Sequence, residues 1–507
     1  MTPSKLKRSI STTLAIAMSL ASFAQSALAV PTESIVIDSM APGKPFVHMW
    51  EQMFGSGRAI LSLRESYRND LRKIKTVADV KYIRFHNIFH DEVGLYDEDK
   101  DGKPVYNFTY IDQIYDGLLD LGVRPFVELS FMPEKLSKTP PSVHDFWYKP
   151  LVGPPKDWDK WGDLNYQFVK HLVERYGIEE VSQWYFEVWN EPDIAFWTGE
   201  PKQESYFKLY DTAVKAIKRC DSRLRVGGPS TATQEWMADF IEHCVKQNVP
   251  VDFVSTHNYA NESDEKAYKE KEEPRRDVLF SNVKKIYDIV KASKRPELPI
   301  FWSEYNASWM NEVNVTDSPF MGPWLANTIR QCDGLANGMS FWTFSDVFEE
   351  NCVAKTPFYG GFGLIAPGGI PKAAFNAFKV LHMLGDVRIP VESTSTIATR
   401  DRAGNLIFAL WNYGPAEKPG STRDFTVKLN GVAKTRKARV HIVDKDHGSA
   451  LTLWEKMGKP SFPSREQQAQ LKKAAELGPP ESLSLNENSE LKITLRPQTL
   501  VVIEIVD

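Results

Sequence analysis

The chain has 507 residues, a formal net charge of −4 and a sequence pI near 6.3. It contains no long basic run, which argues against nucleic acid or an anionic membrane surface as a partner. The length exceeds that of one typical domain, so we expect one large domain and a smaller one. Aromatic residues are abundant, with 14 Trp, 18 Tyr and 28 Phe, and their rings suit the C–H faces of sugars as well as an apolar core.

The amino terminus is typical of a secretory signal peptide. Lys5, Lys7 and Arg8 precede an apolar run that ends near Phe23, and the small residues around Ala29 fit a cleavage site. The apolar run is too short to cross a bilayer comfortably, which argues against a membrane anchor. We therefore expect residues 1–29 to be removed, and the mature protein to be periplasmic or secreted with no membrane partner.

Short apolar strand patterns alternate with amphipathic helical patterns between residues 45 and 385. Helical spacing of apolar residues recurs in segments such as Leu164–Tyr176, Tyr206–Arg219 and Phe280–Lys291. Eight repeated units of this kind predict an α/β fold with a catalytic (β/α)8 barrel. The predicted strands are Phe46–Phe54, Lys81–Ile88, Arg124–Phe131, Gln183–Glu191, Leu224–Pro229, Val251–Tyr259, Leu298–Tyr305 and Gly338–Ser345.

Alternating short strands replace this pattern after the last predicted barrel helix. Leu406–Trp411, Arg439–Val443 and Leu500–Ile505 predict an antiparallel β-sandwich over residues 386–507. The early strand Ser34–Asp38, within residues 30–44, is expected to join the same sandwich. The polar, proline-containing segment Gly458–Pro480 is interpreted as an inserted loop or short helix.

Four cysteines are present, an even number that permits disulfides in an oxidising compartment. Proximity in sequence pairs Cys220 with Cys244 and Cys332 with Cys352, while free buried thiols are the alternative. No C-x-x-C or His/Cys cluster indicates zinc, so we expect no metal and no cofactor.

Two glutamates follow strongly apolar strand patterns. Glu191 comes after Trp184–Trp189, and Glu304 after Pro299–Trp302. The carboxyl ends of barrel strands meet at one face, and these two predicted strands, the fourth and seventh, lie on opposite sides of its mouth. Cleavage of a glycosidic bond needs one acid for the leaving oxygen and one carboxylate facing the anomeric carbon. The pair therefore predicts a glycosidase.

The stereochemical outcome depends on the gap between the two carboxyl groups. A separation of about 5–5.5 Å lets the second carboxylate act as nucleophile with retention, whereas about 6.5–9.5 Å leaves room for water and gives inversion. At the shorter distance the ionised nucleophile raises the pKa of its neighbour and keeps it protonated. The sequence leaves both outcomes open.

Asn190-Glu191-Pro192, together with a glutamate on the seventh strand, resembles the barrel glycosidases that retain configuration. With several further segments, given at the end of this paragraph, the chain resembles glycoside hydrolase family 39, the β-xylosidase and α-L-iduronidase family. The resemblance implies that Glu191 is the acid/base and Glu304 the nucleophile. The segments are Trp50-Glu51, Gly55-Ser56-Gly57-Arg58, Arg84-Phe85-His86, His257-Asn258-Tyr259, Phe341-Trp342 and Gly360-Gly361-Phe362-Gly363-Leu364.

Five other side chains are candidate substrate contacts. Asn190 can donate its amide to the sugar 2-hydroxyl, a bond that strengthens as charge develops. His86 can hydrogen-bond a sugar hydroxyl or serve as a structural group. His257 and Tyr259 project to one side of their strand, where each can orient Glu304 or touch the sugar. Trp342 can stack under the ring or pack structurally.

These features together predict a retaining exo-glycosidase that acts on an oligosaccharide, specifically a β-xylosidase releasing xylose from non-reducing ends. The rivals are an α-L-iduronidase-like or arabinosidase activity and, from another class, a carbohydrate-binding protein without catalysis. An iduronide carries a carboxylate that needs a cation, for which Arg58 is the candidate in this chain. The oligomeric state is left open.

Overall fold

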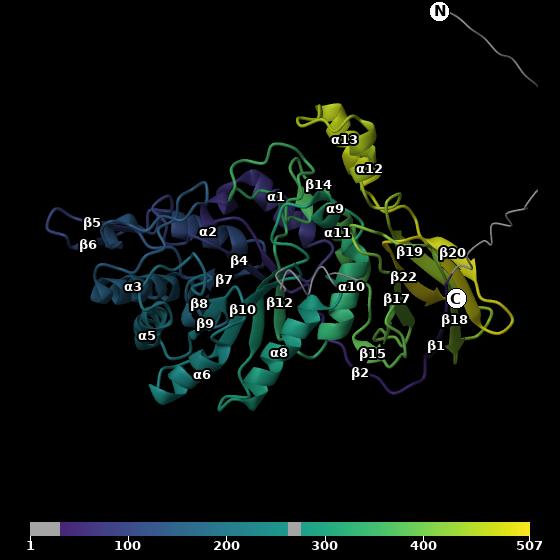
Figure 1. Cartoon of the computed structure of the whole chain (residues 1–507), viewed down its shortest axis with the longest axis horizontal. Coiled ribbons are helices and arrows are strands. Elements are labelled where there is room, and N and C mark those ends of the chain that lie inside the picture. The colour runs from purple at the N-terminus through teal and green to yellow at the C-terminus, as the bar shows by residue number, and fades with distance from the viewer. Residues whose placement is uncertain (1–30, 262–274) are drawn as a thin grey trace, which may run out of the picture.

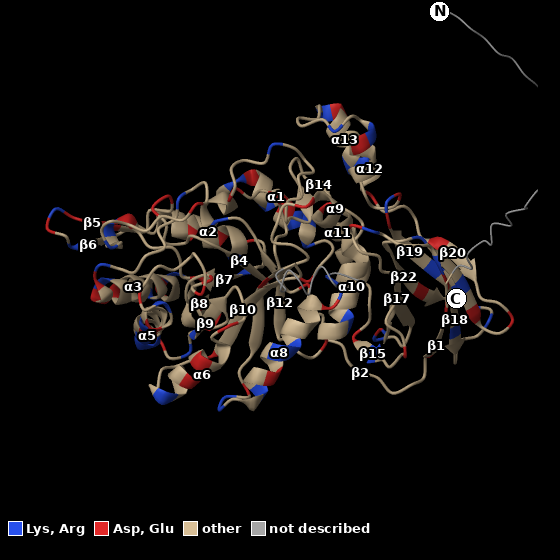
Figure 2. Cartoon of the chain, viewed as in Figure 1, with Lys and Arg blue, Asp and Glu red and all other residues tan. Residues whose placement is uncertain are grey.

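A computed structural model of the protein describes residues 31–261 and 275–507 (Figure 1). The predicted signal peptide lies outside these residues. Figure 1 shows a barrel surrounded by helices beside a smaller part made mainly of strands. None of the described helices combines the length and the apolar character needed to cross a bilayer. Basic and acidic side chains are interspersed over the helices (Figure 2), in keeping with the small net charge.

Parallel strands close into a barrel in their order along the chain, which confirms the predicted (β/α)8 architecture. Within the described ranges the barrel has eight strands: β3 (Met53–Gly55), β4 (Tyr82–Phe85), β7 (Arg124–Glu128), β8 (Tyr185–Glu187), β9 (Arg225–Thr231), β10 (Phe253–Tyr259), β11 (Ile300–Asn306) and β12 (Gly338–Phe341).

Helices cover the outside of the barrel because each buries one apolar face against the strands. The helix over Trp158–Tyr176 begins where the Asp157 carboxylate accepts hydrogen bonds from two backbone N–H groups, and it ends at Gly177, whose φ is 79°. The main outer helices are α1 (Glu65–Ile74), α2 (Thr109–Leu119), α3 (Trp158–Tyr176), α5 (Lys202–Cys220), α6 (Met237–Lys246), α8 (Val278–Ala292), α10 (Met321–Cys332) and α11 (Ala373–Leu381). Shorter elements are η1 (Ala59–Leu63), η2 (Glu134–Leu136), α4 (Ile178–Val181), α9 (Val313–Thr316) and the hairpins β5/β6 (Tyr96–Glu98, Pro104–Tyr106) and β13/β14 (Ile365–Ala366, Ile370–Pro371).

The interior of the barrel changes from apolar to polar along the strands. Phe126 and Phe301 pack with ring centroids 5.5 Å apart in a cluster of aromatic residues that closes the lower end. Side chains two residues further on along a strand point to the same face. The positions after this layer are Arg84, Glu128, Glu187 and Ser303, all buried. The sequence therefore places a polar layer directly under the barrel mouth.

The smaller part consists of two sheets packed face to face around an apolar core. One sheet has the order β2-β15-β16-β17-β22-β19-β20, and the other has the order β1-β18-β21. Antiparallel pairing predominates as predicted, but β1 runs parallel to β18. The strands are β1 (Thr32–Asp38), β2 (Lys44–Pro45), β15 (Val387–Ile389), β16 (Thr396–Arg400), β17 (Leu406–Asn412), β18 (Arg423–Asn430), β19 (Lys437–Val443), β20 (Glu481–Ser484), β21 (Glu490–Leu495) and β22 (Thr499–Val506).

The inserted segment of the smaller part contains helix α13 (Arg465–Ala474), which follows α12 (Leu451–Lys456). A capping box between Ser464 and Gln467 starts α13, and both helices project from the sheets in Figure 1. The short-helix interpretation of this segment is thus confirmed.

The predicted disulfide pairing is wrong, because all four cysteines lie in the described residues and are free. Cys332 ends α10, whereas Cys352 is exposed in the loop after β12, so the two lie at opposite ends of the barrel. Cys220 and Cys244 sit on different outer helices, α5 and α6. A barrel strand lies between the two cysteines of each pair, β9 in one and β12 in the other, so proximity in sequence does not bring the thiols within bonding distance.

Candidate active site

A cavity of about 320 Å³ opens at the carboxyl ends of the barrel strands. Of the predicted site residues, all but His257 line it, and His257 lies buried directly beneath. The lining consists of His86, His144, Phe146, Asn190, Glu191, Ile194, Phe196, Ala232, Tyr259, Glu304, Trp309, Trp342, Glu350, Asn351 and Phe362.

Glu191 lies beyond the end of its strand. The sequence predicts a strand as far as Glu191, but β8 ends at Glu187 and the next residues curl over the barrel mouth. Trp189 and Glu191 have left-handed backbone angles, with φ of 72° and 44°. Such conformations are costly for residues other than glycine and occur preferentially at functional sites. The backbone N–H of Glu191 donates to the Ser230 carbonyl over 2.8 Å, which secures the turn.

Glu304 lies within β11 and has a donor on each carboxylate oxygen. Arg84 Nη1 lies 2.6 Å from Oε1, and the Tyr259 hydroxyl donates to Oε2 over 2.7 Å. Burial by itself would raise the pKa of Glu304, but the nearby positive charges of His257 and Arg84 lower it below its ordinary value. Glu304 is therefore ionised in the resting site.

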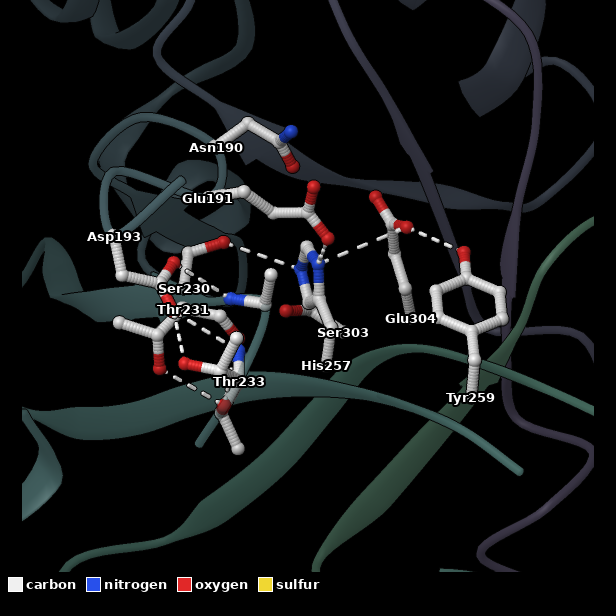
Figure 3. A network of polar contacts seen from close by, with 12 residues as sticks. Asn190, Glu191, Asp193, Ser230, Thr231, Thr233, His257, Tyr259, Ser303 and Glu304 are labelled. Atoms are coloured by element: carbon white, nitrogen blue, oxygen red, sulfur yellow. Dashed lines mark hydrogen bonds and ion pairs between the residues drawn. The ribbon is translucent and has the colours of Figure 1, made fainter. Parts of the chain in front are cut away.

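The pKa of Glu191 is shifted in the opposite direction to that of Glu304. Burial raises its pKa, and the negative charge of Glu304 adds to the increase against the lowering effect of His257. His257 Nδ1 lies 2.8 Å from Glu191 Oε1 and 3.7 Å from Glu304 Oε2 (Figure 3). Facing oxygens of the two carboxyl groups lie within 4.8 Å of each other. The pKa values of the two acids are thus shifted in opposite directions, upward for Glu191 and downward for Glu304.

Arg84 is the centre of the polar layer, a role that the sequence did not reveal. Its fully buried guanidinium donates from Nε to Glu187 over 2.7 Å and from Nη2 to the Asn190 side-chain oxygen over 2.9 Å, in addition to its bond with Glu304. With that oxygen occupied, the Asn190 amide keeps its NH2 group as a donor. Carboxylates, including Glu128 at 2.7 Å, raise the pKa of Arg84 against the lowering effect of burial.

His86 is held as a cation beside the cavity. Its Nδ1 lies 2.7 Å from Glu128 Oε2, and its Nε2 lies 3.7 Å from Glu304 and 3.6 Å from Glu350. Burial opposes the charged form, but the carboxylates of Glu128 and Glu304 raise the pKa of His86 to about 9. The imidazolium can donate to a substrate hydroxyl at this position.

Glu350 is a third acid of the cavity, and sequence reasoning missed it. It lies in the loop after β12, where no strand pattern marks it. Burial raises its pKa to about 8, and the negative charge of Glu304 contributes to the increase. At neutral pH it is mainly a carboxylic acid, which can both donate and accept a hydrogen bond.

Aromatic residues form the apolar walls. Trp342 belongs to a buried cluster with Tyr259, Phe348 and Phe362 on one side of the cavity. Trp309, whose residue surface is 54% exposed, stands at the rim. This arrangement gives a sugar flat apolar surfaces beside charged and hydrogen-bonding groups.

Two sets of His and Glu side chains at the mouth have ligand atoms close enough to consider a metal. They are His86, Glu128 and Glu304, and Glu191, His257 and Glu304. The Arg84 guanidinium already lies against Glu128 and Glu304 and supplies the positive charge of the first set. The second set is the acid pair with its hydrogen-bonded histidine, so hydrogen bonding accounts for both.

Comparison with known proteins matches residues 33–482 to the model of glycosyl hydrolases family 39. A β-xylosidase of Geobacillus stearothermophilus is 40% identical over 83% of this chain and 85% of its own length. A second β-xylosidase, from Caldicellulosiruptor saccharolyticus, is 36% identical over 90% of this chain and 95% of its own. The crystal structure of a monomeric β-xylosidase from Caulobacter crescentus aligns with a TM-score of 0.84 at 32% identity, covering 94% of this chain and 99% of that one. The predicted membership is confirmed: the chain belongs to glycoside hydrolase family 39.

Proposed function

We propose that the protein is a retaining exo-β-xylosidase, with Glu191 as acid/base and Glu304 as nucleophile. The observation that carries this proposal is that one carboxyl oxygen of Glu191 and one of Glu304 lie within 4.8 Å of each other. This proximity supports the separation of about 5–5.5 Å of enzymes that retain configuration over the about 6.5–9.5 Å of inverting enzymes. The two most similar relatives described above, both named β-xylosidases, support the choice of sugar.

The reaction would proceed in two displacements. Glu191 gives its proton to the glycosidic oxygen while Glu304 bonds to the anomeric carbon, so the aglycone leaves and a glycosyl ester remains. Glu191, now ionised, takes a proton from water, whose oxygen attacks the same carbon and frees Glu304. During these steps the Asn190 amide binds the sugar 2-hydroxyl. The Tyr259 hydroxyl keeps its hydrogen bond to the Glu304 carboxylate in the resting site and orients it for attack.

The charge of the cavity supports an uncharged pentose. Among the described residues, no lysine or arginine lines the cavity, and the imidazolium of His86 is already paired with Glu128 at 2.7 Å, whereas an iduronide requires a cation for its own carboxylate. Arg58, the candidate for that role, is buried and paired with Glu92 at 2.8 Å and Glu349 at 3.0 Å. A volume of about 320 Å³ also lies near the lower end of ligand pockets, about 300–1,000 Å³, and suits removal of one terminal sugar.

A panel of aryl glycosides tests the proposal. We expect the β-D-xyloside to be hydrolysed with a higher kcat/KM than the α-L-arabinoside or the α-L-iduronide, and NMR to show β-xylose as the first product. Release of α-xylose would contradict retention. Tight binding of xylose without any hydrolysis would favour the alternative of a carbohydrate-binding protein.

We further propose that the enzyme acts in the periplasm or outside the cell, on the basis of the signal-peptide pattern in residues 1–29. Mass spectrometry of the mature protein should show an amino terminus near Val30. Retention of the whole segment in a protein found in the cytoplasm would contradict this location.

A further inference from the structure

A buried ion cluster lies outside the catalytic network, behind one wall of the cavity. Lys372 Nζ lies 2.7 Å from Asp317 Oδ1 and 2.6 Å from Asp346 Oδ2, and the side chains of all three are inaccessible to solvent. Burying three charges is expensive, and a hydrophobic replacement is often equally stable. Stability alone therefore does not explain why these three charged side chains are buried together.

The cluster binds one short backbone segment at three successive places. Lys372 donates to the Gly361 carbonyl over 2.8 Å, Asp317 accepts the Gly360 N–H over 2.6 Å, and Asp346 accepts the Gly363 N–H over 2.7 Å. A Cβ added at Gly361 or Gly363 would collide with Asp346, so the glycines permit this close approach.

The segment carries Phe362, whose side chain lines the sugar cavity. Phe362 packs edge-on against Phe348 at 5.6 Å, and Phe348 packs in the same way against Trp342 at 5.8 Å. The Phe362 carbonyl also accepts the Thr343 N–H over 3.1 Å, directly after Trp342. Tyr259, the hydrogen-bond donor to Glu304, belongs to the same aromatic cluster.

We propose that Lys372 is a positioning residue for the reaction: with Asp317 and Asp346 it fixes the Gly360–Gly363 segment, and thereby the aromatic wall that holds the sugar and the Tyr259–Glu304 contact. This inference rests on the proposed glycosidase function of the same cavity. Lys372 contacts neither Glu191 nor Glu304, so its effect on the reaction passes through Phe362 and the aromatic residues beside it.

The first test compares Lys372→Met with Arg388→Met, which breaks a 2.7 Å ion pair with Asp333 at the junction with the smaller part. Both are assayed with the aryl glycoside that the wild type hydrolyses best, at a temperature where both stay folded. We expect Lys372→Met to lose about 100-fold in kcat/KM, mainly in kcat, since small misplacements at a reacting centre have effects of that size. Arg388→Met should stay close to the wild type. Equal kinetics of the two variants would overturn the proposal.

A second variant distinguishes the loss of positioning by Lys372 from the cost of leaving two aspartates without their cation. It also provides a test if Lys372→Met does not fold. The triple change Lys372→Met, Asp317→Asn, Asp346→Asn removes all three charges while keeping side-chain volume. We expect its melting temperature to recover towards the wild type while kcat/KM stays at least about tenfold low. Full recovery of activity together with stability would show a structural role only. A wild type that prefers another glycoside would overturn the xylosidase proposal without affecting this comparison.

Discussion

The imidazole of His257 lies under the carboxyl group of Glu191, with Nδ1 2.8 Å from Oε1. A donated Nδ1–H occupies this oxygen and leaves the other to carry the acidic proton. The contact explains how a glutamate that projects from a turn keeps one orientation towards the leaving group.

Removal of either acid should separate their roles. Glu191→Ala should lose about 10²–10⁴-fold in kcat/KM on xylobiose, because the leaving sugar then departs without a proton, and much less on a dinitrophenyl xyloside. Glu304→Ala should abolish turnover of both substrates. Steady-state kinetics on the two substrates give the comparison, and equal losses in Glu191→Ala would contradict its role as acid.

The pKa of Glu191 should fall when Glu304 is esterified. The negative charge of Glu304 raises the pKa of Glu191, so trapping the intermediate with a 2-fluoro xyloside removes that contribution. Carbon-13 NMR of labelled glutamate in the free and trapped enzyme measures the difference. An unchanged pKa would mean that the two carboxyl groups are not electrostatically coupled.

Replacement of Arg84 should lower the stability of the protein and shift the acid limb of the pH profile of kcat/KM. Arg84→Met leaves buried carboxylates unpaired and should cost about 3–5 kcal/mol in the free energy of unfolding. The positive charge of Arg84 lowers the pKa of Glu304, so its loss raises that pKa and moves the acid limb of kcat/KM to higher pH. Arg84→Lys, which keeps the charge, is the matched control and should shift the limb less.

Glu350 should make folding less favourable as the pH rises. Its pKa is raised from 4.5 to about 8 in the folded protein, so the folded state keeps a proton that the unfolded chain loses over this interval. The stability that it contributes is present below the unfolded value and disappears as the pH rises through the folded value. Urea titrations across the interval should show the free energy of unfolding falling more steeply in the wild type than in Glu350→Gln. Parallel curves would contradict the raised pKa.

Thiol chemistry checks the free cysteines. Because none of the four is paired, thiol titration of the denatured, unreduced protein should count all of them, and a reducing agent should leave the melting temperature unchanged. Exposed Cys352 should react first in the native protein, and buried Cys332 last. A count of two or none would restore the disulfide interpretation.

The sequence predicts the barrel well because apolar periodicity marks each buried strand, and it places Glu304 correctly within β11. It misplaces the end of β8 because the left-handed angles at Trp189 and Glu191 leave no trace in an apolar pattern. The sequence does not identify Arg84 as the centre of the polar layer, because its partners come from distant segments and meet only in the closed barrel. Glu350 lies in a loop, where hydrophobic periodicity carries no information.

The last strand of the chain, β22, lies between β17 and β19 in the larger sheet of the smaller part. On its far side β17 pairs with β16, and on its far side β19 pairs with β20, so β22 is the strand that joins the two halves of this sheet. Without β22 the two halves, β2-β15-β16-β17 and β19-β20, would share no backbone pairing. Deleting the final few residues would expose two interior edges to intermolecular pairing.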